Sequence, residues 1–191
     1  MYYKTTYQSP IGQITLTSDG ESITGLWLPN HQDIESHYDD KLIEKDQPVF
    51  EQATHWLDSY FSGNKPKIDF PLKAIGTPFR ETVWKILLEI PHGETVTYSD
   101  VARKVALERG KEKMSSQAVG GAVGSNPISI IIPCHRVVGK DGSLTGYGGG
   151  IDTKIELLKL EQLDMTQFYK PKNSTKPWVW YCLFCDFKCI C

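Results

Sequence analysis

The 191-residue chain lacks features that define several whole classes of protein. No apolar run approaches the roughly 20 residues that a membrane-spanning helix needs, and the first residues lack the apolar stretch of a secretory signal peptide. The formal net charge is only −2, so no excess of positive charge draws the whole chain to nucleic acid or to an anionic membrane. Internal repeats and low-complexity tracts are absent, and 40% hydrophobic with 23% charged residues is a globular composition. We therefore expect a globular, cytoplasmic protein whose binding surfaces are local.

Cysteine is scarce until the last ten residues. Cys134 stands alone, whereas the other four of the five cysteines crowd the C-terminus at Cys182, Cys185, Cys189 and Cys191. An odd count without an export signal argues against a disulfide framework, so Cys134 is expected to be a free thiol. A zinc ribbon usually separates its two cysteine pairs by many residues, and this C-terminal cluster is too cramped for that. An unligated tail is the favoured interpretation, and a zinc site is the alternative.

Charge and pattern divide the chain into three parts, 1–73, 74–165 and 166–191. The first has 6 basic and 11 acidic residues, the second 11 of each, and the third 4 basic and 1 acidic. In the first part, aromatic, β-branched and alternating residues predict three strands over 2–7, 12–17 and 22–28, joined by turns. Apolar residues at helical spacing then predict a helix near 49–61. The first part is expected to be a small antiparallel sheet with a helix.

The second part is expected to be mainly helical. Thr77 before Pro78 predicts one helix start, Thr97 with Asp100 a capping box for another, and Ser115 or Ser116 a third. The last two helices resemble a helix-turn-helix with a long connector. The apolar run over 128–132 predicts a buried extended segment, and the pattern over 154–163 predicts a closing helix. The chain is therefore expected to be a two-domain α/β (α+β) protein with a less regular tail over 166–191.

The sharpest chemical feature is Cys134, which follows the apolar run and precedes His135 and Arg136. The thiolate is the nucleophilic form of cysteine, and nearby positive charge lowers the pKa of a thiol. A nucleophile is one interpretation of this pattern. The other is a buried cysteine beside a structural histidine, because free cysteine is often buried.

Residues 126–139 resemble the active-site signature of the O6-alkylguanine-DNA alkyltransferases, also named methylated-DNA–protein-cysteine S-methyltransferases. Further motifs resemble the family in order and spacing over 76–161, namely residues 76–79, 83–84, 90–93, 97–98, 146–150 and 157–161. Several separate motifs in register are far more specific than one Cys-His-Arg. The N-terminal sheet is compatible with the family's more variable first domain.

The resemblance implies direct, irreversible DNA repair. The family's cysteine takes the alkyl group from O6-alkylguanine, and from O4-alkylthymine, and keeps it as a thioether, so each molecule acts once. Cys134 would be the nucleophile, His135 would take its proton through a bound water, and Glu161 would orient His135. For Glu161 the alternative is a solvated helix carboxylate. Tyr98 would donate to the departing guanine, Asn126 would hold the turn beside the active site, and the base pocket would be lined by Tyr147, Gly148, Val137 and Ser129.

The resemblance also implies that the damaged base is flipped out of the duplex, because a buried thiol cannot reach O6 inside the stack. The family's recognition helix enters the minor groove and fills the gap with an arginine, whereas this chain has Gln117 there. Glutamine can insert but brings no charge, so weaker flipping or an altered substrate preference follows. The other DNA-binding candidates are Ser115, Ser116, Ala118, Gly120, Gly121 and Arg136, with phosphate contacts from Arg103, Lys104, Arg109, Lys111 and Lys113. For the two glycines helix packing is the alternative, and for the basic residues a solvated face.

The expected partner is double-stranded DNA carrying O6-alkylguanine, bound by a monomer without cofactor, metal or membrane. Two other functions stay open. One is a DNA-binding module that recognises alkylated bases without accepting the group, and the other is a Cys-His hydrolase that turns over many times. Retention of Cys134 argues against the first, and the matches at Asn126 and Tyr98 argue against the second.

Overall fold

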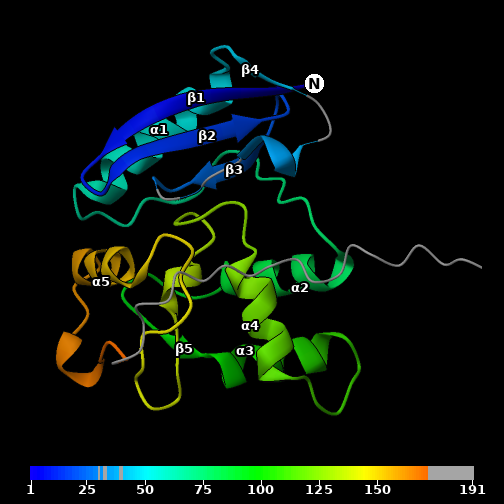
Figure 1. Ribbon diagram of the computed structural model, residues 1–191, viewed down its shortest axis with the longest axis vertical. Coiled ribbons are helices and arrows are strands. Elements are labelled where there is room, and N and C mark those ends of the chain that lie inside the picture. The colour runs from blue at the N-terminus through cyan, green and yellow to red at the C-terminus, as the bar shows by residue number, and fades with distance from the viewer. Residues whose placement is uncertain (30, 32–33, 39–40, 172–191) are drawn as a thin grey trace, which may run out of the picture.

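The protein consists of an N-terminal sheet with one helix and a C-terminal group of helices, which lie one above the other in Figure 1. The computed structural model describes residues 1–29, 31, 34–38 and 41–171. Within these ranges, no helix is long and apolar enough to cross a membrane. The Cys-rich segment that we expect to be an unligated tail lies outside the described residues.

The N-terminal sheet has four strands in the order β3-β2-β1-β4. The meander of β1 (Tyr2–Ser9), β2 (Gly12–Ser18) and β3 (Ile23–Trp27) is antiparallel, which confirms the prediction. The sequence missed β4 (Leu42–Glu44), which pairs with β1 in parallel, because three residues are too few to show an alternating pattern. A short 3-10 helix, η1 (Ile34–His37), precedes β4.

The helix α1 (Pro48–Phe61) packs against the sheet, close to its predicted bounds. It buries one face, made of Val49, Phe50, Ala53, Trp56, Leu57 and Tyr60. The last turn of this helix carries Tyr60 toward the C-terminal part.

The predicted helix starts of the C-terminal part are confirmed. Thr77 caps α2 (Pro78–Leu87) by accepting from Arg80 N, and Ser115 caps α4 (Ser116–Gly124) by accepting from Ala118 N. Both bonds of the capping box are present at the start of α3 (Tyr98–Glu108). The remaining elements are α5 (Ile151–Leu160), η3 (Met165–Gln167) and a parallel pair formed by β5 (Val96–Thr97) and β6 (Val137–Val138). The closing helix thus begins three residues earlier than predicted, at Ile151.

The prediction of an extended strand over 128–132 is wrong. The segment is buried, but Ile130 has a φ of 68°, and Ile132 N donates to Ile128 O at 3.0 Å, so the chain turns instead of running straight. A β-branched residue at positive φ is strained. Asn126 closes this turn by accepting from Ile128 N and donating to Ile132 O. Cys134 therefore follows a tight turn and is the first residue of the 3-10 helix η2 (Cys134–Arg136).

One cluster of buried apolar side chains joins the two parts. It runs from Ile14 and Leu16 of the sheet through Tyr60 of α1 to Val83 of α2 and Cys134. Backbone bonds reinforce the junction, because Leu26 N of β3 donates to Pro127 O at 2.8 Å. The segment that carries Cys134 is thus fastened to the N-terminal sheet.

Candidate active site

Cys134 is a buried thiol, 5% exposed, that accepts a hydrogen bond. Its Sγ lies 3.1 Å from Nδ2 of Asn126, whose side chain also holds the 128–132 turn. Burial raises the pKa of the Cys134 thiol, while the Asn126 N–H and the positive charge of Lys154 oppose that effect. At neutral pH the resting site therefore holds a thiol, and a base must remove its proton before it can act as a nucleophile.

His135, the next residue in the chain, is a candidate for that base. Its side chain is fully buried, and Nε2 lies 2.7 Å from Oε1 of Glu161. Burial lowers the pKa of His135, although the hydrogen bond and charge of Glu161 act in the opposite direction. A neutral imidazole beside a carboxylate must place its proton on Nε2, so Nδ1 keeps its lone pair. Nδ1 is buried and has no hydrogen-bond partner among the described residues, which leaves it able to accept a proton.

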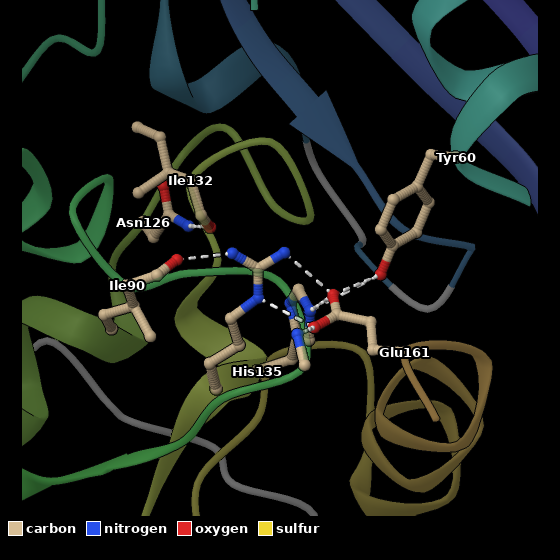
Figure 2. A network of polar contacts seen from close by, with 8 residues as sticks. Tyr60, Ile90, Asn126, Ile132, His135 and Glu161 are labelled. Carbon is tan, nitrogen blue, oxygen red and sulfur yellow. Dashed lines mark hydrogen bonds and ion pairs between the residues drawn. The ribbon is translucent and has the colours of Figure 1, made fainter. Parts of the chain in front are cut away.

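Glu161 is the centre of the polar network drawn in Figure 2. The carboxylate, at the C-cap of α5, is 2% exposed, which rules out the alternative of a solvated helix residue. Burial raises its pKa, but the hydrogen bonds and charges of His135 and Arg136 outweigh that effect and hold the pKa well below its usual range. Glu161 is therefore ionised and can stabilise an imidazolium on His135.

Five donated hydrogen bonds converge on this carboxylate. Oε1 accepts from Tyr60 Oη at 2.8 Å, from His135 Nε2 and from Arg136 Nη2 at 2.9 Å. Oε2 accepts from Arg136 Nε at 2.9 Å and from Gly93 N at 3.0 Å. An ionised carboxylate offers about four lone-pair sites, so Glu161 is saturated and its position is over-determined.

The expectation that Arg136 contacts DNA is a mistake that the structure corrects. The residue is 8% exposed, its guanidinium makes two bonds to Glu161, and Nη1 donates to Ile90 O at 2.6 Å. A guanidinium forms this planar, two-pronged bond with a carboxylate readily, and burial strengthens the pairing. Arg136 therefore holds Glu161 and does not lie at the surface.

Lys154 is a second buried cation, and sequence analysis missed it. The residue is 0% exposed, and Nζ donates to Val137 O at 2.6 Å and to Thr145 O at 3.1 Å. Burial lowers the pKa of Lys154 to about 8, while the interaction with Cys134 acts in the opposite direction. The helical pattern held a signal for it, because Lys154 lies three residues after Ile151 and three before Leu157, on the buried face of α5.

The residues expected around the substrate lie near this network. Tyr98, at the start of α3, donates to Thr145 O at 3.0 Å, the same carbonyl that Lys154 uses, and burial raises the pKa of Tyr98 to about 12. The ring of Tyr147 lies 6.4 Å from that of His135, and its buried hydroxyl has no partner among the described residues. The other three differ in exposure, since Val137 is buried, Ser129 half-buried and Gly148 exposed.

The helix α4 presents a polar and glycine-rich surface to solvent. Ser115, Ser116, Gln117, Ala118 and Gly121 are exposed, and Gly120 is half-exposed. A Cβ at Gly121 would meet nothing within 4 Å, and one at Gly120 would meet Tyr98 only at 3.9 Å. Helix packing therefore does not require either glycine, although glycine weakens a helix by roughly 1 kcal/mol relative to alanine.

The buried face of helix α4 packs against two other helices. Its residues pack on α2 and α3, and Trp84 Nε1 of α2 donates to Ala122 O at 2.8 Å. Of the basic candidates nearby, Arg103 pairs with Asp100 at 3.3 Å and Lys104 with Glu89 at 3.1 Å, so part of this charge is neutralised in place. Arg109, Lys111 and Lys113 are exposed.

A family model described as "6-O-methylguanine DNA methyltransferase, DNA binding domain" matches residues 78–163. A second, described as "6-O-methylguanine DNA methyltransferase, ribonuclease-like domain", matches residues 2–74. Together the two matches span the N-terminal sheet and the C-terminal helices.

Curated proteins and solved structures agree with these matches. A methylated-DNA–protein-cysteine methyltransferase of Haemophilus influenzae is 42% identical over 92% of this chain and 93% of its own length. The crystal structure of the O6-methylguanine methyltransferase of Mycobacterium tuberculosis is 41% identical, with a TM-score of 0.73 over 85% of this chain and 93% of that one. The M. tuberculosis protein named OGT, in complex with DNA, is 40% identical, with a TM-score of 0.72 over 84% and 92% of the two chains.

Proposed function

Since this chain belongs to the 6-O-methylguanine DNA methyltransferase family, we propose that it repairs DNA by moving the alkyl group of O6-alkylguanine onto Cys134. The chain is a methylated-DNA–protein-cysteine methyltransferase, and the identity of the acceptor is our inference. The observation that supports it most is the buried Cys134 thiol directly before a His135–Glu161 pair.

The proposed reaction is a displacement at the alkyl carbon. The Cys134 Sγ–C bond forms while the C–O6 bond breaks, and the product is a thioether and an unmodified guanine. The thiol proton passes through a water to Nδ1 of His135, Glu161 stabilises the imidazolium, and a proton returned to the purine completes the balance. Tyr98 would donate to the guanine as it leaves. A thioether has no route back to a thiol here, so each molecule reacts once.

The burial of Cys134 supports base flipping, because a thiol with 5% exposure cannot reach O6 within a stacked duplex. The pocket that receives the base would be lined by Tyr147, Gly148, Val137 and Ser129. An O4-alkylthymine could enter the same pocket. We also propose a cytoplasmic location. The working form is proposed to be a monomer, because one chain supplies all of Cys134, His135 and Glu161.

The exposed surface of α4 supports a role in the DNA minor groove. Because packing does not need Gly120 or Gly121, their small size favours close approach of the helix to DNA. Gln117 is exposed at the start of this helix and would fill the gap left by the flipped base. Its neutral amide can hydrogen-bond the unpaired base but adds no attraction to phosphate.

The deciding experiment is mass spectrometry of the intact protein and its peptides after mixing with excess duplex DNA that contains O6-methylguanine. We expect one added methyl group on the Cys134 peptide, saturating at one per molecule. Cys134→Ala should accept no methyl while still binding the DNA. Selective binding without methylation of the wild type would establish the non-catalytic module, and continued turnover would establish the hydrolase.

The role of Gln117 is tested by Gln117→Arg. If the residue acts on flipping, the variant should react faster with duplex DNA and equally fast with the free base O6-methylguanine. Gln52→Arg is a matched control that adds the same charge at an exposed position of α1. Equal acceleration on both substrates, or by both variants, would contradict this role.

A further inference from the structure

Tyr60 carries a hydroxyl from the N-terminal part of the chain into the active-site network. It lies in the last turn of α1, is 1% exposed, and donates to Oε1 of Glu161 at 2.8 Å across 101 positions of sequence. The hydroxyl oxygen of Tyr60 itself lies 3.4 Å from Nε2 of His135. Figure 2 shows Tyr60 entering from the side opposite α5 and pointing at the carboxylate of Glu161.

The hydroxyl competes with His135 for one oxygen atom. Oε1 of Glu161 accepts from Tyr60, His135 and Arg136, whereas Oε2 accepts from Arg136 and Gly93. Each further donor takes a share of the negative charge on Oε1. A carboxylate that already accepts from Tyr60 is therefore a weaker acceptor for the proton on His135 Nε2.

We propose that Tyr60 is a positioning residue of the alkyl-transfer site, whose hydroxyl shares Oε1 of Glu161 with His135 and so sets how strongly Glu161 stabilises a protonated His135. The catalytic consequence rests on the proposed function, because it matters only if His135 takes the proton of Cys134. The sharing itself is a property of the resting protein and can be measured without any DNA.

The remaining contacts separate this role from a merely structural one. Without the Tyr60 hydroxyl, Glu161 still accepts two bonds from Arg136, one from Gly93 and one from His135, so the carboxylate stays in place. The Tyr60 ring also keeps its own packing, because it stacks on Trp56 with centroids 5.3 Å apart. Removal of the hydroxyl thus changes the charge distribution on Glu161 more than the geometry.

Removal of the Tyr60 hydroxyl also leaves every other titratable group near His135 in place. Burial and Glu161 raise the pKa of Tyr60 far above neutrality, so its loss alters no formal charge. Six other titratable or charged groups surround His135 and Tyr60. They are Cys134 and Arg136 of η2, Lys154 of α5 and Glu161 at its C-cap, His92 in the loop after α2, and Tyr147 in the loop after β6. All six remain when only the Tyr60 hydroxyl is removed.

The test is Tyr60→Phe, with Tyr7→Phe as the matched control. Tyr7 is also a tyrosine of the N-terminal part that donates to a carboxylate, Asp58, at 2.7 Å, but it lies outside the network. In Tyr60→Phe, Glu161 accepts more strongly from His135, so the pKa of His135 should rise. A typical hydrogen-bond contribution corresponds to a shift of about half to one pH unit.

Two readouts follow the same shift. Nitrogen-15 NMR of the His135 ring as a function of pH measures its pKa directly, without substrate. The pH profile of single-turnover methyl transfer should move its acidic limb upward by the same amount, which lowers the rate about three- to tenfold below that limb. DNA affinity should not change, and Tyr7→Phe should coincide with the wild type in both readouts.

If the pKa of His135 is the same in Tyr60→Phe as in the wild type, the proposal is overturned. This holds even if the variant reacts more slowly, by the same factor at every pH. Introducing 3-fluorotyrosine at position 60 keeps the test available if the phenylalanine variant does not fold. Its more acidic hydroxyl is a stronger donor, so the pKa of His135 should fall instead of rise. If the ring titrates as expected but no methyl is transferred by the wild type, the shared oxygen is supported and the proposed function fails.

Discussion

Replacing Glu161 by Gln tests the centre of the network, because that carboxylate accepts five hydrogen bonds and balances a buried cation. The amide of Glu161→Gln keeps the shape of the side chain but turns one oxygen into a donor. That new donor faces at least two N–H or O–H groups, whichever way the amide is oriented. Among the described residues, no other carboxylate pairs with Arg136, which is 8% exposed, so the variant leaves its charge unbalanced.

The expected loss of stability is large. Removing one partner of a buried ion pair typically costs about 3–5 kcal/mol, because the other charge stays buried and unpaired. For a chain of this size each kcal/mol lowers Tm by about 2–4 °C, so Tm should fall by about 6–20 °C. Asp152→Asn is the matched control on the same helix, since Asp152 pairs with Lys170 at 2.8 Å but is 80% exposed. Such a surface pair contributes only about 0–1 kcal/mol.

The loss should depend on pH in a defined direction. The pKa of Glu161 is depressed in the folded protein, so its stabilising contribution is present above its ordinary pKa of 4.5 and is lost as the pH falls toward the folded-state value. The variant lacks this titration. The difference in stability between wild type and Glu161→Gln should therefore be constant near neutrality and become smaller below about pH 4.5.

Urea denaturation at several pH values measures both effects, with the slope m as a check that the unfolded states are comparable. A destabilisation of Glu161→Gln no larger than that of Asp152→Asn would refute the argument, because it would mean that Arg136 finds solvent or another partner. A difference that does not diminish in acid would show that Glu161 does not titrate as an ion-paired group.

Two further predictions concern α5 and α4. Burial depresses the pKa of Lys154 from 10.5 to about 8, so between these pH values the unfolded state binds the proton more tightly than the folded state does. The free energy of unfolding of the wild type should therefore rise by about 3 kcal/mol relative to that of Lys154→Met when denaturation is measured from pH 7.5 to 10.5. Parallel pH curves for the two proteins would contradict this prediction. Gly121→Ala should stabilise the protein by about 0.5–1 kcal/mol, because its Cβ meets nothing within 4 Å, yet weaken binding to duplex DNA. Unchanged affinity in a fluorescence anisotropy titration would remove the proposed contact between this glycine and DNA.

Local signals in the sequence were sufficient for most of the fold. The N-caps at Thr77, Thr97 and Ser115 depend only on residues within three positions in the sequence, and all three are confirmed. The run over 128–132 failed because an apolar sequence reports burial but not backbone direction. Asn126 bends that run through contacts with atoms two and six residues ahead, and a strand pattern does not consider them.

The candidate site was predictable only in part, for a different reason. Cys134 and His135 are adjacent in sequence, and Glu161 followed from a family resemblance. Tyr60 and Lys154 carry no local motif. Glu161 and Tyr60 are 101 positions apart, and their contact exists only because α1 packs against both the sheet and the C-terminal part. Arg136 was assigned to the wrong surface because an arginine's sequence neighbours do not reveal a carboxylate 25 positions away.

The buried charges explain why these non-local residues matter to the thiol. Glu161 balances one of two buried cations, Arg136, whereas Lys154 donates to backbone carbonyls, and no carboxylate pairs with it among the described residues. Burial alone would keep the proton on Cys134, but the positive charge of Lys154 and the N–H of Asn126 lower the thiol pKa against that effect. In the proposed mechanism, a thiolate on Cys134 would form beside the positive charge of Lys154, and His135 would carry its proton away. In the same proposal, an alkylated sulfur could no longer carry that negative charge, so the arrangement that would favour one transfer would offer nothing to reverse it.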